Sequence, residues 1–131
     1  MANEWVPVEL YGTNNEGDIR RYTIADGTAV SKGQILFLSD PRTVSLTHAN
    51  IMGGVASEDH KANVGVTSIG AWTNGVFEAV ASGAIACGAP FRPTDFNKVA
   101  ACPYAASGAM IGGYVLEDCA DAETVNVRLM L

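Results

Sequence analysis

Apolar and polar residues alternate in several short stretches of this chain, which is the pattern of half-buried β-strands. The cleanest alternation is "TVNVRLML" at 124–131, where every second residue is apolar and the residues between are mostly polar. Two shorter runs, "NVGVTSI" (63–69) and "VFEAVA" (76–81), have the same character. No long window shows the i, i+3, i+4, i+7 stripe of an amphipathic helix, so the pattern predicts a chain made of strands.

Turn-forming residues separate these strands. Clusters such as "ADGT", "SDPR", "TNG" and "ASG" punctuate the chain, and glycine, proline, asparagine and aspartate are the residues that tight turns require. Short strands separated by frequent turns are typical of an all-β sandwich or barrel.

The chain also repeats itself. Three segments of the first half match three segments of the second half in the same order, which predicts an internal duplication over about 25–69 and 81–131. The matching pairs are "ADGTAVSKG" (25–33) with "ASGAIACG" (81–88), "GQILFLSDPRTVSL" (33–46) with "GAPFRPTDFNKVAA" (88–101), and "GGVASED" (53–59) with "GGYVLED" (112–118).

The duplication bears on the fold because one such unit cannot hide its apolar face alone. Two units packed together, or closed into one barrel, can do so. We therefore predict an all-β fold with little helix: a compact β-barrel or sandwich of the β-tulip kind, built from two similar halves. Residues 22–131 are expected to form this single domain.

Residues 1–21 are predicted to be an N-terminal arm or edge segment. Pro7 argues against a central strand because proline cannot donate a ladder hydrogen bond. The segment is either an edge strand that covers the barrel or an arm that adds to the sheet of a partner, with Trp5 as its anchor. The candidate binding residues of the arm are Asn3, Glu4, Trp5, Val6, Pro7, Val8 and Leu10.

Composition narrows the possible partners. The chain has 131 residues, of which 48% are hydrophobic, and a net charge of −6. Such a chain has enough apolar residues for a core, and its acidity is a poor fit to nucleic-acid phosphates. No stretch approaches the roughly 20 apolar residues of a membrane helix. We expect neither nucleic acid nor membrane as partners.

Few residues of the sequence are candidates for catalysis, metal binding or covalent modification. The three cysteines have no metal-ligand spacing and predict reduced, packed thiols. Asp59 and His60 could contact a metal, but a third ligand at suitable spacing is missing. "DGTAVSKGQIL" resembles the entry of biotinyl and lipoyl carrier domains, with Lys61 as the candidate modified residue, and this stays an alternative. We predict no catalytic residue, no metal, no cofactor and no enzymatic activity.

A broader resemblance covers residues 22–131. The stretch "GQILFLSDPRTVSLTHANIMGGVASEDHKANVGVTSIGAWTNGVFEAVASG" and the ending "IGGYVLEDCADAETVNVRL" are similar to phage head decoration proteins, of the lambda type and of the related DUF2190-like group. The shared features are an apolar strand, an Asp turn, a second strand, "GGVA" with an acidic turn, and "G-V-F".

The resemblance implies a capsid cement: a homotrimer on the outer surface of the virion, after synthesis in the host cytoplasm. It would bind where major capsid protein subunits meet and stabilise the shell. In such proteins the N-terminal segment pairs with the capsid, a role that here would fall to residues 3–10. The chain lacks the long Pro/Ala/Thr-rich arm of the lambda type. Another β-rich virion component, such as a tail or fibre-base module, is the alternative.

Overall fold

The computed structural model describes residues 3–11, 18–49, 51–102 and 112–131, and in these residues the protein is almost entirely β-structure. A single short 3₁₀ turn, η2 (Asp95–Asn97), interrupts the described strands. The strands are β1 (Val6–Leu10), β2 (Ile19–Thr23), β3 (Ile35–Asp40), β4 (Thr43–Ser45), β5 (Met52–Ala56), β6 (Ser68–Trp72), β7 (Asn74–Ala81), β8 (Pro90–Pro93), β9 (Lys98–Ala101), β10 (Gly113–Val115) and β11 (Thr124–Met130). The predicted all-β class with little helix is confirmed.

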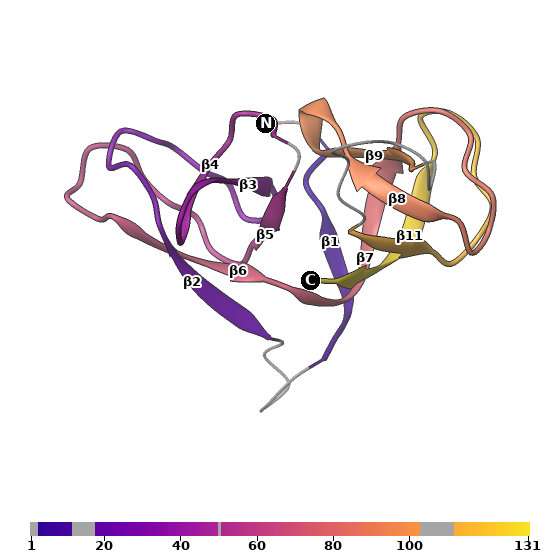
Figure 1. Cartoon of the computed structure of the whole chain (residues 1–131), viewed down its shortest axis with the longest axis horizontal. Coiled ribbons are helices and arrows are strands. Elements are labelled where there is room, and N and C mark those ends of the chain that lie inside the picture. The colour runs from indigo at the N-terminus through magenta and orange to yellow at the C-terminus, as the bar shows by residue number, and fades with distance from the viewer. Residues whose placement is uncertain (1–2, 12–17, 50, 103–111) are drawn as a thin grey trace.

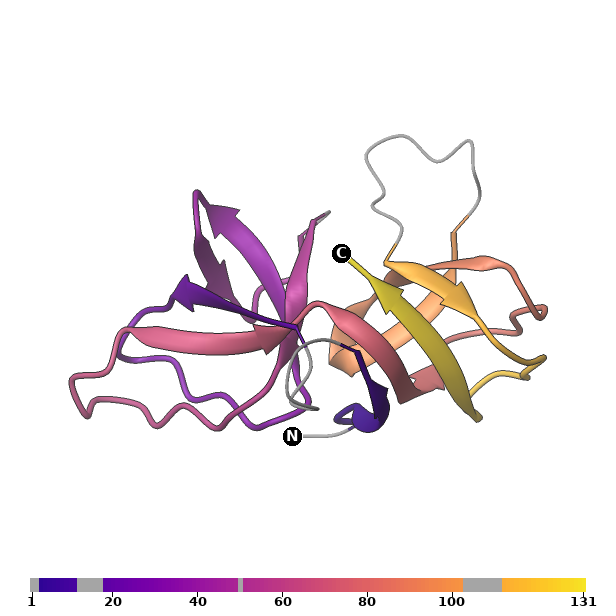
Figure 2. The same ribbon diagram turned by 90° about the horizontal axis from the view of Figure 1, so that it is seen from below.

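The strands form two small closed barrels that lie side by side (Figures 1 and 2). Barrel 1 has the strand order β2-β4-β3-β5-β6. Barrel 2 has the order β7-β11-β10-β8-β9 and is closed by pairing between β7 and β9. Strand β1 is the additional strand of this second sheet, where it pairs with β7.

The two barrels have the same strand connectivity. In each, the first strand pairs in parallel with the third and antiparallel with the fifth: β2 with β4 and β6, and β7 with β9 and β11. An isolated bridge outside the strands also recurs, between Val30 and His60 in barrel 1 and between Ile85 and Cys119 in barrel 2. The fold is therefore built from two similar halves, as predicted. Each half closes on itself, whereas the sequence had left open a single barrel shared by both.

The repeated acidic turn has the same local role in both barrels. The Asp59 carboxylate accepts a hydrogen bond from the backbone N–H of Lys32 at 2.7 Å. The Asp118 carboxylate accepts one from the N–H of Cys87 at the same distance. Each aspartate thus satisfies a backbone donor of the facing loop, which explains why the "ED" pair recurs in the sequence.

The core has two parts. The interior of barrel 1 is filled by a cluster that includes Tyr22, Leu36, Val44 and Ile69. A larger cluster fills barrel 2 and continues into the contact between the barrels, where Ile35 and Phe37 of β3 join it. Leu36 points into barrel 1, so its neighbours at 35 and 37 point out of that barrel. The uninterrupted apolar run in "QILFL" follows from this arrangement, because both faces of β3 are buried.

Paired glycines allow close backbone approach at equivalent places. Gly54 in β5 and Gly113 in β10 have φ of 155° and 153°. A Cβ on Gly54 would lie 2.7 Å from the carbonyl oxygen of Trp72, and one on Gly113 would collide with the carbonyl oxygen of Arg128. These two glycines let the fourth strand of each barrel approach the fifth.

We therefore expect Gly113→Ala to lower the free energy of unfolding by about 2–5 kcal/mol, from backbone strain and overpacking together. Gly27→Ala is the matched control, because its Cβ would meet only Asn63 Oδ1, at 3.7 Å. Urea denaturation of both variants measures the difference. Equal stability of the two variants would contradict this account of the repeated glycine.

Candidate docking surface

The predicted arm is folded onto the protein's own second barrel in this structure. Strand β1 pairs antiparallel with β7, with Val6 opposite Glu78 and Leu10 opposite Gly75, and a bulge lies between Pro7 and Glu9. The N-terminal strand thus skips the barrel that follows it in sequence and joins the later one. Of the two interpretations of this segment, its placement corresponds to the edge strand.

Trp5 is in the interior and is only 2% exposed. Its ring lies 5.8 Å from that of Phe77 and 5.9 Å from that of Phe91, centroid to centroid. Its backbone N–H donates to Gly33 O in barrel 1 at 2.8 Å, and its indole Nε1–H donates to Asn97 O in barrel 2 at 2.9 Å. In this conformation the indole of Trp5, which the sequence suggested as an anchor on a partner, is enclosed by its own chain.

The other predicted arm residues divide by exposure. Val6 and Val8 are each 53% exposed, which is unusual for β-branched apolar side chains on a strand. Glu4, Pro7 and Leu10 are half-buried. These residues form one continuous segment along the outside of β7, and the valines are the ones that can reach a partner.

Asn3 fixes a turn of barrel 2 instead of pointing outward. Its side-chain Nδ2 donates to the carbonyl oxygen of Phe96 at 3.1 Å. Together with the indole of Trp5, it holds two consecutive backbone carbonyls of η2. The N-terminal segment therefore has a structural role at the contact between the barrels, in addition to any role in binding.

At the end of β1, Tyr11 packs on the guanidinium of Arg128, with 4.6 Å from Cζ to the ring centroid. The Tyr11 hydroxyl donates to the Glu9 carboxylate at 2.7 Å. That hydrogen bond, with partial desolvation and the charge of Glu9, raises the pKa of Tyr11 above its ordinary value. The phenol therefore stays neutral at physiological pH and keeps donating to Glu9.

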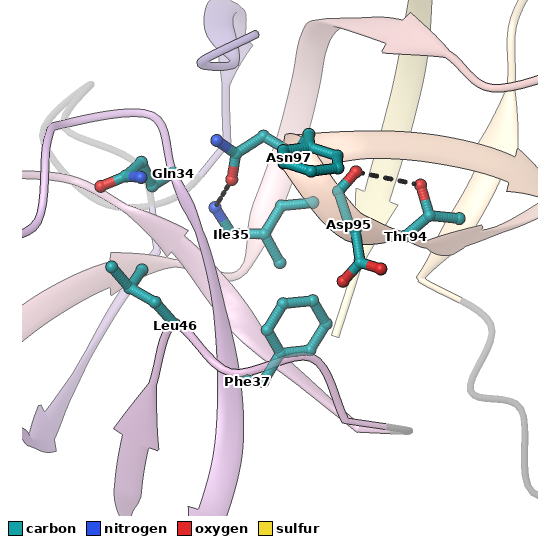
Figure 3. Close-up of a pocket in the computed structure, with 8 residues that line it drawn as sticks. Gln34, Ile35, Phe37, Leu46, Thr94, Asp95 and Asn97 are labelled. Carbon is teal, nitrogen blue, oxygen red and sulfur yellow. Dashed lines mark hydrogen bonds between the residues drawn. The ribbon is translucent and has the colours of Figure 1, made fainter. Parts of the chain in front are cut away.

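A hollow lies where the two barrels meet near η2 (Figure 3). Its volume is about 230 Å³, and it is lined by Gln34, Ile35, Phe37, Leu46, Thr94, Asp95, Phe96 and Asn97. Asn97 spans the contact, because its Oδ1 accepts the backbone N–H of Ile35 at 2.9 Å. On its rim, Phe96 is 78% exposed, the highest exposure among the large apolar residues of the described chain.

Sequence reasoning missed Phe96. The stretch "PTDFN" was used only as part of the repeated segment 88–101, as one of its turns. The available signal was an aromatic residue in the middle of that turn, where glycine, asparagine or aspartate is usual. A bulky apolar residue that a turn does not require points to a role outside the turn itself.

The remaining candidate residues, such as His60, do not form a metal site in the described part of the chain. Both ring nitrogens of His60 lie against backbone carbonyl oxygens, of Thr28 at 2.6 Å and Val66 at 2.7 Å, so its ring is engaged structurally. In the described residues no group of three metal-ligating side chains is found, nor any helix long and apolar enough to cross a membrane. Cys102 is buried, as predicted for packed thiols, whereas Cys87 is exposed and Cys119 is half-buried.

The two closed barrels and the exposed apolar side chains define an all-β protein whose surface offers apolar contacts to a partner. The model of the phage cement protein family matches residues 15–131. The chain therefore belongs to the phage cement protein family, and it is a virion component that binds the capsid and stabilises it. The resemblance to phage head decoration proteins is confirmed. The family match replaces the alternative in which Lys61 is the modified residue of a biotinyl or lipoyl carrier domain.

A solved structure shows the same fold. The chain is similar to the head fibre gp8.5 N base of bacteriophage phi29, with a TM-score of 0.56 and 16% sequence identity, over 86% of this chain and 94% of that chain. At this identity the likeness shows the fold alone. A comparison with curated proteins finds no match.

Trp5→Ala is expected to lower the free energy of unfolding by about 3–5 kcal/mol, because it leaves a cavity between the barrels and removes the hydrogen bond to Asn97. Val8→Ala, at an exposed position of the same segment, should change stability by less than about 0.5 kcal/mol. Chemical denaturation measures both. A Trp5→Ala protein as stable as Val8→Ala would show that the indole does not join the barrels in solution.

Proposed function

We propose that this protein decorates the outside of the phage head at junctions between major capsid protein subunits, as a homotrimer, and braces the shell against internal pressure. The match of the cement family over residues 15–131 carries this proposal. The net charge of −6, which disfavours contact with packaged DNA, is consistent with it.

We further propose that the N-terminal segment, residues 3–10, contributes to capsid binding while it remains part of the fold. Strand β1 is an edge strand whose described ladder partner is β7. An edge strand with exposed valines can accept an extended segment of a partner, whose backbone provides affinity and whose side chains provide specificity. Val6 and Val8 would then contact the capsid, while Trp5 keeps the strand in place.

The shared connectivity of the two barrels supports an origin by duplication of one unit, over about 25–69 and 81–131. Barrel 2 carries β1 and Phe96 in addition to the common unit. The features that barrel 2 adds, β1 and Phe96, would then take part in binding.

A second candidate function is a base on which a head fibre stands. The solved structure with the same fold is itself the N base of a head fibre. The two functions share attachment to the head and differ in whether a further protein is bound on top. Electron microscopy of purified particles that carry the protein distinguishes the two functions. A decoration protein would form a small protrusion with nothing bound on top, whereas a fibre base would carry a fibre.

The direct test is co-sedimentation of the purified protein with undecorated shells assembled from the major capsid protein of the same phage. We expect saturable binding, and light scattering of the free protein should give the mass of a trimer. Failure of the wild-type protein to bind shells would overturn the decoration function, and a monomer would overturn the proposed trimer.

The proposed role of β1 is tested by the double variant Val6→Asp/Val8→Asp. It should weaken shell binding at least about tenfold, because two charges replace apolar contacts at a sheet edge. Val64→Asp, at a 57% exposed valine in barrel 1, is the matched control and should bind as the wild type does. Substitution is preferable to deletion of residues 1–11, because loss of Trp5 would unfold the contact between the barrels.

A further inference from the structure

Phe96 combines a disfavoured backbone conformation with near-complete exposure. It has φ of 61° and ψ of 31°, in the left-handed region, and Asn97 after it has φ of 63°. Left-handed backbone is unfavourable for a bulky residue, because Cβ crowds the carbonyl oxygen, whereas glycine and asparagine tolerate it. The side chain gains little burial in return, since 78% of it is exposed. Folding alone therefore does not explain phenylalanine at this position.

The surrounding contacts hold this conformation firmly. The carbonyl of Phe96 accepts a hydrogen bond from Asn3, and that of Asn97 accepts one from the Trp5 indole. The Asn97 side chain in turn accepts the N–H of Ile35 from the other barrel. Strain that neighbouring structure maintains is characteristic of binding sites, where it fixes a side chain before the partner arrives.

The equivalent turn of barrel 1 shows that the fold does not require left-handed backbone at the position of Phe96. Arg42 of that turn, the counterpart of Asn97, is also left-handed, with φ of 52°. "SDPRT" of barrel 1 corresponds to "TDFNK" of barrel 2, so Pro41 stands where barrel 2 has Phe96. Proline cannot adopt a positive φ, and barrel 1 still connects its second and third strands, β3 and β4, through this turn. The exposed aromatic residue is thus a feature of barrel 2 alone.

The hollow beside Phe96 is suited to an apolar side chain. Three of its lining residues from barrel 1, Ile35, Phe37 and Leu46, are apolar. Its volume of about 230 Å³ exceeds the roughly 150 Å³ that admits a benzene molecule in an apolar protein cavity. One leucine, isoleucine or phenylalanine side chain from a partner therefore fits between Phe96 and β3.

Charge indicates the kind of partner. Asp95 lines the hollow and is exposed, and none of the described residues that line it is basic. The contacts of the proposed trimer are heterologous, so a second copy docked here would set a different part of the same acidic molecule, of net charge −6, against Asp95. A partner with lysine or arginine beside its apolar side chain would be attracted instead.

We propose that Phe96 and the hollow between the barrels form a docking site for a loop of the capsid protein, one that inserts an apolar side chain and places a basic residue against Asp95. This inference rests on the proposed capsid decoration and names the surface that performs it. The trimer contacts of the proposed assembly would then lie elsewhere on the molecule.

The decisive variant is Phe96→Asn, because it removes the aromatic ring and relieves the strain at once. We expect the dissociation constant for shells of the major capsid protein to rise at least about 30-fold. The midpoint of thermal unfolding should rise by about 2–5 °C, since asparagine tolerates the left-handed region. A variant that is more stable and binds less excludes misfolding as the cause. Phe96→Leu, which stays apolar, should retain most of the binding.

The matched control is Val64→Asn, another exposed apolar residue, which should bind shells as the wild type does. The charge contact is tested by Asp95→Lys, which should weaken binding at low salt and lose most of that effect at high salt. Asp95→Asn should fall between the wild type and Asp95→Lys.

The outcomes separate this inference from the function on which it rests. If the wild type does not bind shells, the decoration function fails. If the wild type binds and Phe96→Asn binds equally well, the docking site is overturned while the decoration function stands. If Phe96→Asn instead changes the oligomeric state measured by light scattering, the occupant is a second copy of the chain, and the capsid loop is overturned.

Discussion

The contact between the two barrels depends on the indole of Trp5. Each barrel closes through its own strand ladder, and a short link between β6 and β7 joins the two. Trp5 connects them by packing on Phe77 and Phe91 while its two N–H groups donate to opposite barrels. The aromatic contact excludes water, and the hydrogen bonds fix the angle of approach. The position of every surface feature near this contact follows from that geometry.

The same contact explains why the N-terminal segment is both structural and exposed. A strand that pairs only on one edge gains little stability by itself, and Trp5 supplies the burial that keeps β1 on β7. With the strand held, Val6 and Val8 can remain on the surface without loosening the segment. A free arm would have to order its backbone on binding, at a cost on the order of 1–2 kcal/mol per residue. An arm that is already paired avoids that cost.

Much of the fold could be predicted from local patterns. Alternation in "TVNVRLML" located β11, and the recurrence of "GGV" and "GGY" located equivalent strands, because these signals depend on neighbouring residues alone. The separate closure of each half was not predictable, since it depends on pairings such as Val80 with Lys98 that are remote in sequence. The surroundings of Trp5 were not predictable, because the sequence does not show whether a tryptophan near a terminus packs on its own chain or on another. Phe96 was missed because its unusual feature is a left-handed backbone conformation. The sequence shows only an unexpected residue in a turn.

The two barrels share one strand connectivity and differ in the turn between their second and third strands. Pro41 and Phe96 occupy corresponding places in turns that connect corresponding strands. In barrel 1 the position of Phe96 is taken by proline, whose φ is fixed and negative, and the left-handed residue of that turn is Arg42. In barrel 2 an aromatic residue sits in a conformation it disfavours, and hydrogen bonds from Asn3 and Trp5 maintain it. Those donors come from the N-terminal segment, which pairs with barrel 2. The segment that joins the barrels therefore also stabilises the strained turn, so docking at Phe96 and attachment of β1 are physically coupled: a change that loosens Trp5 should release both.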